Sequence, residues 1–321
     1  MGEFDLIERY FKKAVRHADL GVGDDCALLR TAPGHQLAMS TDMLVEGRHF
    51  LSTVKPEHLG HKALAVNLSD LAACGAAPKA FLLSLALPRV EPLWLEGFSK
   101  GLFQLAELHG CELIGGDTTQ GPLTISITVL GEVPHGQALL RSGARAGDDL
   151  YVSGTLGDAR LALEAFRGHL RLPEAVFEHA RTRMEAPSPR VALGMALRGV
   201  ATAAADISDG LLGDLGHILK ASGVGASIDW PLAQGLLGCH ALWDCPSDWA
   251  QTCILSGGDD YELVFTAPAQ ARAQVQAAAM QSQTAVTRIG SIRQGTGLEV
   301  LDAQGQALQR QFHSFDHFAT P

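Results

Sequence analysis

The stretch Gly21-Val22-Gly23-Asp24-Asp25-Cys26 places two glycines directly before two adjacent carboxylates. Glycine lets the backbone turn tightly because it carries no Cβ atom. Two unit charges about 4 Å apart repel each other by about 4 kcal/mol at an effective dielectric constant of about 20. A chain therefore keeps such a pair where both side chains point to water, or where a cation lies between them.

The combination of small residues and aspartate recurs in four further clusters. Two contain the double glycine and two lack it: Ile114-Gly115-Gly116-Asp117-Thr118-Thr119, Leu255-Ser256-Gly257-Gly258-Asp259-Asp260, Ser40-Thr41-Asp42 and Asp206-Ile207-Ser208-Asp209-Gly210. Each aspartate taken alone is also explained as a turn former or a helix cap. The recurrence favours a common explanation, which is a shared site for divalent cations and phosphates.

Composition excludes several classes of protein. The chain has 321 residues, of which 46% are hydrophobic, and a formal net charge of −10 without a run of Lys or Arg, which argues against nucleic acid as a partner. Phosphate ligands stay open because bound cations would invert the local field. The six cysteines form no Cys-x-x-Cys motif, which is typical of a reduced, cytoplasmic protein. We expect neither a signal peptide nor a membrane span.

Hydrophobic periodicity predicts alternating helices and strands in the first part of the chain. We expect helices over residues 3–16, 57–74 and 91–109, and strands over 26–29, 36–40, 81–87, 113–114 and 123–133. The alternation over 123–133 is typical of an antiparallel or interface strand with one buried face. Several aspartate clusters then follow a strand end, where ligand-binding residues of α/β sheets tend to lie.

A linker rich in Gly and Pro over residues 134–149 separates two domains, 1–140 and 141–321. In the second domain we expect helices over 158–167, 188–198 and 209–221. The expected strands cover 150–153, 201–205, 252–255, 261–265, 286–289 and 298–301. Ser188 would cap its helix and Pro189 would occupy its first position.

Asp70 lies on an otherwise apolar part of the predicted helix 57–74, three residues after Asn67. One interpretation is a surface aspartate on the outer helix face. The other is a metal ligand that faces the aspartate clusters.

Several common motifs for nucleotide binding and catalysis are missing from the sequence, which limits the reactions that the aspartate clusters could support. The sequence has no Gly-Lys dipeptide, no protein-kinase signature and no Gly-x-Ser-x-Gly elbow. His313 and His317 have helical spacing but no third ligand nearby, which disfavours zinc. The remaining candidates are oxygen ligands, which select Mg²⁺ or Ca²⁺: Asp25, Thr41, Asp42, Asp70, Asp117, Asp206 and Asp209. Several Mg²⁺ ions bridging a polyphosphate would suit phosphoryl transfer, in which catalysis is mostly positioning and charge neutralisation.

Six stretches together resemble the thiamine-monophosphate kinase family. They are Gly21–Ala27, Ser40–Asp42, Asn67–Ala73, Ile114–Thr119, Asp206–Leu211 and Ser256–Leu263. The resemblance runs in order along nearly the whole chain. It implies the PurM-like architecture of the superfamily typified by aminoimidazole ribonucleotide synthetase: an α/β (α+β) fold of two domains, with an N-terminal mixed sheet that contributes to a homodimer.

The resemblance also implies the reaction and the roles of the residues. ATP and thiamine monophosphate would give ADP and thiamine diphosphate at a cluster of Mg²⁺ ions, without a general base. The implied metal ligands are Asp25, Ser40, Thr41, Asp42, Asp70, Asp117, Asp206 and Asp209. The implied ATP contacts are Gly116, Asp117, Arg141 and Ser208, and the implied substrate contacts are His49, Asp259 and Phe315. Asp259 departs from the family pattern Gly-Gly-Glu, and Phe315 stands where Tyr or Trp is common.

Two alternatives stay open at the level of sequence. Another member of the superfamily would activate an amide or selenide acceptor with ATP. Against it, Cys26 lies within the kinase pattern, and the C-terminal cysteine expected of the hydrogenase-maturation relative is missing. A protein that binds metal or thiamine phosphate without turnover would carry the same ligands.

Overall fold

The computed structural model describes residues 2–309, and the chain divides into two compact units. The N-terminal unit contains the chain up to Leu71 together with Ala76–Gly136. The C-terminal unit contains Ala72–Gly75 and the chain from Gln137 onward. Within the described residues, no helix is both long and apolar enough to cross a membrane.

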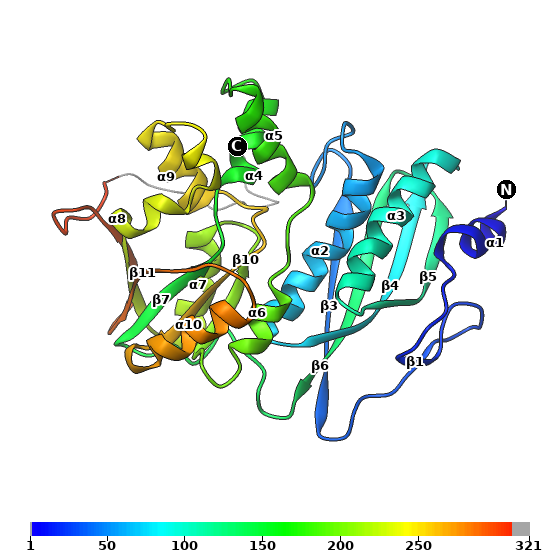
Figure 1. Ribbon diagram of the computed structural model, residues 1–321, viewed down its shortest axis with the longest axis horizontal. Helices are drawn as coiled ribbons and strands as arrows, with labels where there is room; N and C mark the ends of the chain where they lie inside the picture. Colours follow the sequence, from blue (N-terminus) through cyan, green and yellow to red (C-terminus); the bar gives the residue numbers. More distant parts are fainter. Residues whose placement is uncertain (1, 310–321) are drawn as a thin grey trace. The chain divides into compact units, whose positions relative to one another are not determined.

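The N-terminal unit is built on a four-stranded sheet with the order β3-β6-β4-β5 (Figure 1). The strands are β3 (His35–Val45), β4 (Ala77–Leu87), β5 (Glu112–Gln120) and β6 (Thr124–Pro134). β6 pairs antiparallel with β3 and β4, whereas β4 and β5 are parallel. A small second sheet joins β1 (Ala18–Leu20) to β2 (Leu28–Leu29).

Helices α2 (Pro56–Cys74) and α3 (Pro92–Leu108) run beside this sheet (Figure 1). Two glycines allow the helices to approach closely. A Cβ atom on Gly60 would overlap the Phe98 carbonyl oxygen, and one on Gly101 would overlap the Glu57 carbonyl oxygen. α2 is apolar on most of its surface and is buried along most of its length, from Leu59 onward.

The C-terminal unit contains a six-stranded sheet with the order β12-β9-β11-β7-β10-β8. The strands are β7 (Asp148–Ser153), β8 (Ala203–Ile207), β9 (Gly225–Asp229), β10 (Glu262–Pro268), β11 (Val286–Arg293) and β12 (Leu298–Leu301). Only the β12–β9 pair is parallel. The helices are α4 (Asp158–Phe166), α5 (Glu174–Glu185), α6 (Val191–Ala196), α7 (Leu211–Ser222), α8 (Trp230–Ala233), α9 (Ser247–Ser256) and α10 (Arg272–Gln281).

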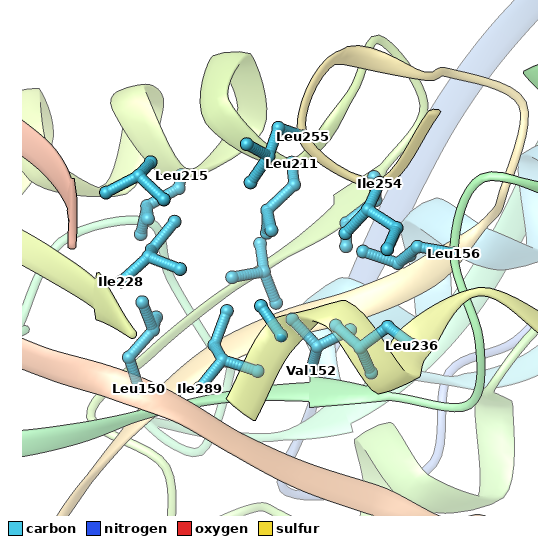
Figure 2. Packing of buried hydrophobic residues seen from close by; sticks show 14 of the residues in the cluster. Leu150, Val152, Leu156, Leu211, Leu215, Ile228, Leu236, Ile254, Leu255 and Ile289 are labelled. Carbon is cyan, nitrogen blue, oxygen red and sulfur yellow. The ribbon is translucent and has the colours of Figure 1, made fainter. Parts of the chain in front are cut away.

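The main core of this unit lies between one face of the sheet and its helices (Figure 2). Leu211 and Leu215 of α7 and Ile254 and Leu255 of α9 pack over Val152 of β7 and its neighbours, which are all buried. Strand alternation sends Tyr151 and Phe265 to the other face, where their rings stack 5.2 Å apart. α7 and α9 are thereby anchored, and the loops that precede α7 and follow α9 carry candidate site residues.

Several sequence-based predictions of elements are confirmed and others are wrong. The helices predicted over 57–74 and 91–109, and the strand over 298–301, match the structure within one residue. The helix predicted over 3–16 ends much earlier, since α1 covers Glu3–Leu6 and a π-helical turn ends at Phe11. The backbone N–H groups of Arg16 and His17 instead donate to the carboxylate of Glu112 (2.7 and 2.8 Å).

The strand predicted over 252–255 is wrong, because these residues belong to helix α9. A short apolar run such as Thr-Cys-Ile-Leu has no periodicity that separates a buried helix from a buried strand. The helix predicted over 188–198 is shorter and begins at Val191, so Ser188 is not its cap. Sequence periodicity also missed α5, α8, α10 and β9.

Candidate active site

In the N-terminal unit, strand β3 and helix α2 bring three candidate metal ligands together. The Ser40 hydroxyl donates a short hydrogen bond to Asp70, and the Asp42 backbone N–H donates to Asn67 Oδ1 (3.1 Å). Ser40 and Asp42 are two residues apart on a strand and therefore share one face. Asp70 is half-buried and faces β3, so its interpretation as a surface aspartate is wrong.

Thr41 points to the opposite face of the sheet. Its hydroxyl donates to the Ile127 carbonyl oxygen and accepts a hydrogen bond from the Thr128 hydroxyl, both at 3.0 Å. Its side chain is exposed. The structure therefore does not place the Thr41 hydroxyl with Ser40 and Asp42.

Asp117 lies in the middle of β5, because this strand continues through the glycine pair instead of ending at residue 114. Gly116 has φ +145°, and a Cβ atom there would overlap the Leu83 carbonyl oxygen, so only glycine fits. β5 and β3 are the two edge strands, which puts Asp117 and Asp42 about 14 Å apart at about 4.8 Å per strand spacing. This separation is too large for both carboxylates to bind one Mg²⁺ ion.

The first aspartate cluster forms an exposed loop between β1 and β2. Gly23 has φ +131°, as expected for a tight turn, and Asp24 Oδ1 accepts the Asp25 backbone N–H (2.9 Å). Asp25 is exposed. The hydrogen bond from the Asp25 N–H to Asp24 therefore holds the backbone of the loop.

His49 lies in the turn after β3 and has a defined tautomer. The Val45 backbone N–H donates to His49 Nδ1 (3.0 Å), so Nδ1 carries the lone pair and Nε2 carries the proton. The buried Lys62 donates to the His49 carbonyl oxygen (3.2 Å). His49 is thus oriented as a hydrogen-bond donor through Nε2.

In the C-terminal unit, a three-residue loop between β8 and α7 carries Ser208 and Asp209. The N–H groups of Ser208, Asp209 and Gly210 all donate to Asp214 Oδ2 at 3.1 Å. Asp214 is buried, and this burial raises its pKa to about 6. Asp206 is also buried and lies in β8 opposite Leu263.

A second loop, which follows α9, packs directly on the first. The Asp259 N–H donates to the Ser208 carbonyl oxygen (2.8 Å), and the Tyr261 N–H donates to the Ile207 carbonyl oxygen (2.9 Å). Asp259 and Tyr261 have φ values of +67° and +52°, and the Tyr261 hydroxyl donates to Asp259 Oδ1 (3.0 Å). The structure therefore brings Ser208, Asp209 and Asp259 together, although these loops are about 50 residues apart in sequence.

Two buried carboxylates next to Asp259 were missed by sequence reasoning. Asp260 accepts the Gly157 N–H with both oxygens (3.0 Å each), and burial raises its pKa well above the ordinary value. Glu262 is fully buried and binds Ser153, Arg183 and Arg190. Their position directly after Gly257-Gly258-Asp259 could have marked Asp260 and Glu262 as residues near the site. The sequence pattern does not show that their carboxylates are buried.

The structure gives few contacts for the implied ATP contact Arg141 and none for the implied substrate contact Phe315. Arg141 lies in an exposed segment, where its carbonyl oxygen accepts the Ser222 hydroxyl (3.2 Å). Phe315 lies outside the described residues.

Within residues 2–309, no three His, Cys, Asp or Glu side chains are grouped closely enough to hold one metal ion.

Comparison with known proteins identifies each of the two units. The family model for AIR synthase related protein, N-terminal domain, matches residues 23–133, and that for the C-terminal domain matches residues 145–303. The thiamine-monophosphate kinase of Escherichia coli (strain K12) is 45% identical over 327 residues, with 100% of this chain and 99% of the relative covered. The chain belongs to the thiamine-monophosphate kinase family. The family resemblance and the mixed α/β fold class are thereby confirmed.

Two solved structures are similar to this member of the thiamine-monophosphate kinase family. The thiamine-monophosphate kinase from Stenotrophomonas maltophilia K279a is 44% identical with a TM-score of 0.84, covering 95% of this chain and 96% of that chain. A structure described as AaThiL complexed with AMPPCP and TMP is 31% identical with a TM-score of 0.75, covering 98% and 96%.

Proposed function

We propose that this chain transfers the γ-phosphoryl group of ATP to thiamine monophosphate and releases thiamine diphosphate and ADP. The observation that carries the proposal is the full-length similarity to a kinase structure that holds AMPPCP and TMP together. The identity of 45% to the E. coli enzyme over both full lengths supports the same reaction.

The candidate site suits this reaction because the reaction needs no general base. The acceptor is a phosphate monoester whose second pKa is near 6, so at pH 7 it is mostly a dianion and already a nucleophile. Direct in-line transfer then depends on holding two anionic groups together. On this proposal, His49 donates from Nε2 to a phosphate oxygen, and Ser208 contacts ATP.

The proposed metal is Mg²⁺, whose ions when bound would neutralise the phosphate oxygens and bring them together. The donors Ser40, Asp42 and Asp70 fit because they are hard oxygen ligands on one side of β3. The other proposed Mg²⁺ ligands are Asp25 and Asp117 in the N-terminal unit and Asp206 and Asp209 in the C-terminal unit. The Thr41 hydroxyl lies on the opposite face of β3 and does not join Ser40 and Asp42. Mg²⁺ usually takes one or two carboxylates and completes its coordination with water and substrate phosphates, so we infer that metal binding depends on bound nucleotide.

The homodimer and the reducing compartment are also part of the proposal. Strand β3 is an edge strand of 11 residues, and it exposes Leu37, Met39 and Met43. Long apolar edge strands are normally covered, and a second copy of this chain would cover this one. No disulfide joins the six cysteines, all of which lie within residues 2–309, and this supports a cytoplasmic location.

The direct test is incubation with ATP, Mg²⁺ and thiamine monophosphate, followed by chromatographic separation of the products. We expect thiamine diphosphate and ADP in equal amounts, and no product after chelation with EDTA. ADP and free phosphate without thiamine diphosphate would contradict the proposed acceptor. Intact ATP in the presence of Mg²⁺ would contradict the kinase assignment altogether.

Asp70→Asn tests the proposed metal site. We expect kcat to fall by about two orders of magnitude, because one charged ligand is lost while the hydrogen bond to Ser40 can persist. The matched control is Asp19→Asn, which changes an exposed aspartate of the same unit that pairs with Arg30. Steady-state kinetics at several Mg²⁺ concentrations measure both, and equal activity of the two variants would contradict a role for Asp70 in metal binding.

A further inference from the structure

One buried carboxylate oxygen organises the loop that carries Ser208 and Asp209. Asp214, in the first turn of α7, accepts three consecutive backbone N–H groups on Oδ2, and no more than 4% of the residue is exposed. Converging N–H groups of this kind commonly bind anions such as phosphate. Here the anion is a side chain of the chain itself.

This arrangement decides how the loop can meet a nucleotide. The N–H groups of residues 208–210 point inward to Asp214 and are not available to a phosphate. Contacts from this loop must therefore be made by side chains, such as the Ser208 hydroxyl and the Asp209 carboxylate. Their directions depend on the loop backbone, which Asp214 holds from inside.

The other side of the same loop is bound to the segment that carries Asp259. The carbonyl oxygens of Ile207 and Ser208 accept the N–H groups of Tyr261 and Asp259. Gly258 packs so closely on the Ser208 carbonyl oxygen that a Cβ atom would overlap it. A shift of residues 208–210 would thus displace Asp259 as well.

We propose that Asp214 is a positioning residue. It holds the loop that carries Ser208 and Asp209 in place, and through this loop it also holds the segment that carries Asp259. This inference rests on the proposed function for the roles of Ser208, Asp209 and Asp259. Asp214 is buried and its bonded oxygen already accepts three hydrogen bonds, so the proposal gives it no direct contact with metal or substrate.

The test compares Asp214→Ala with Asp214→Asn. Alanine leaves three N–H groups without their acceptor, so we expect kcat to fall about 100-fold, the loss expected from a displacement of about 1 Å. The asparagine oxygen can occupy the same place as a weaker, neutral acceptor, so we expect kcat within about 10-fold of the parent. The affinity for AMPPCP with Mg²⁺, measured by calorimetry, should follow the same order.

Asp148→Asn is the matched control. Asp148 is equally buried and its Oδ2 also accepts a backbone N–H, from Arg145 (2.9 Å), but it holds a different turn. We expect this variant to keep the parent kcat and AMPPCP affinity. Thermal unfolding of all variants by circular dichroism separates loss of folding from loss of positioning.

The kinetics and AMPPCP binding of the folded variants test the role of Asp214. Parent-like kinetics of folded Asp214→Ala would overturn it, and so would equal impairment of folded Ala and Asn variants, which would indicate direct action of the charge. If Asp214→Ala does not fold, weaker AMPPCP binding by folded Asp214→Asn supports the inference and parent-like binding overturns it. A parent that makes no thiamine diphosphate refutes the proposed function alone, because AMPPCP binding still decides the role of Asp214. A parent that binds no AMPPCP overturns both.

Discussion

Glu262 has no exposed surface, and its carboxylate is held by several donors. It accepts hydrogen bonds from the Ser153 hydroxyl (2.6 Å), from Arg183 Nη2 (2.9 Å) and from two nitrogens of Arg190. A buried charge requires such partners, because its desolvation costs several kcal/mol. Gly154 lies against this carboxylate with φ +53°. The network therefore depends on a residue without a side chain.

Gly154→Ala should destabilise the protein by about 3 kcal/mol, because the methyl group adds overpacking to the strain of a left-handed backbone. Gly168→Ala is the control, since Gly168 has φ +76° but no atom within 4 Å of its Cβ position. The control should cost only about 1 kcal/mol. Urea unfolding measures both, and equal losses would show that contact with Glu262 contributes nothing.

At the scale of elements, the close approach of α2 and α3 depends on glycine at specific positions. Gly101→Ala should destabilise the protein by about 3 kcal/mol, because the new methyl group meets the backbone carbonyl of Glu57 and the helices must separate. Gly97→Ala lies one turn earlier on α3, where the new methyl group meets the Pro56 side chain at 3.1 Å and the Glu57 backbone nitrogen at an ordinary contact distance of 3.6 Å. We expect a change below about 1 kcal/mol there, since helix propensity improves. Equal urea midpoints for the two variants would contradict this account of the helix contact.

Asp149 connects three elements of the C-terminal unit. Arg272, the first residue of α10, binds it through two nitrogens (2.6 and 2.9 Å), and Arg288 of β11 lies 3.4 Å away. The hydrogen bond from Arg272 is the largest cause that lowers the pKa of Asp149 below its ordinary 3.8, and it outweighs the opposing effect of burial.

A lowered pKa gives the pH dependence a definite sign. The unfolded chain binds a proton at Asp149 more readily than the folded chain, so this carboxylate stabilises the fold at pH above 3.8. Its contribution is lost as pH falls through the lower folded pKa. We expect the stability difference between the parent and Asp149→Asn to shrink between about pH 5 and about pH 2 in urea titrations. A difference that stays constant over this range would refute the assignment.

At the scale of the whole molecule, the proposed homodimer makes β3 the element to test. The double substitution Met39→Lys and Met43→Lys places two charges on the apolar edge, where burial against a second copy would cost several kcal/mol. We expect a monomer by light scattering coupled to size-exclusion chromatography, with the parent a dimer. Leu93→Lys is the control, because Leu93 is 85% exposed on α3 of the same unit and away from β3. A monomeric parent, or a double variant that still dimerises, would contradict the proposal.

The sequence by itself determined the family, the two-part α/β organisation and the main aspartate clusters. Each of these depends on local information: hydrophobic periodicity for α2 and α3, and short motifs such as Ser40-Thr41-Asp42. The spacing of Asn67 and Asp70 indicated one helix face, and both residues contact β3. The division at residues 140 and 141 stays a prediction, as do the ligand roles.

Only the tertiary structure decided which side chains meet and which are buried. Thr41 lies on the other sheet face from its neighbours because strand side chains alternate, and Asp117 lies mid-strand because β5 pairs with β4 beyond the glycines. The Thr252–Leu255 run is helical because packing, not periodicity, selects the conformation of short apolar segments. The role of Asp214 was not visible in the sequence, because three N–H groups converge on one oxygen only after the backbone between β8 and α7 has folded.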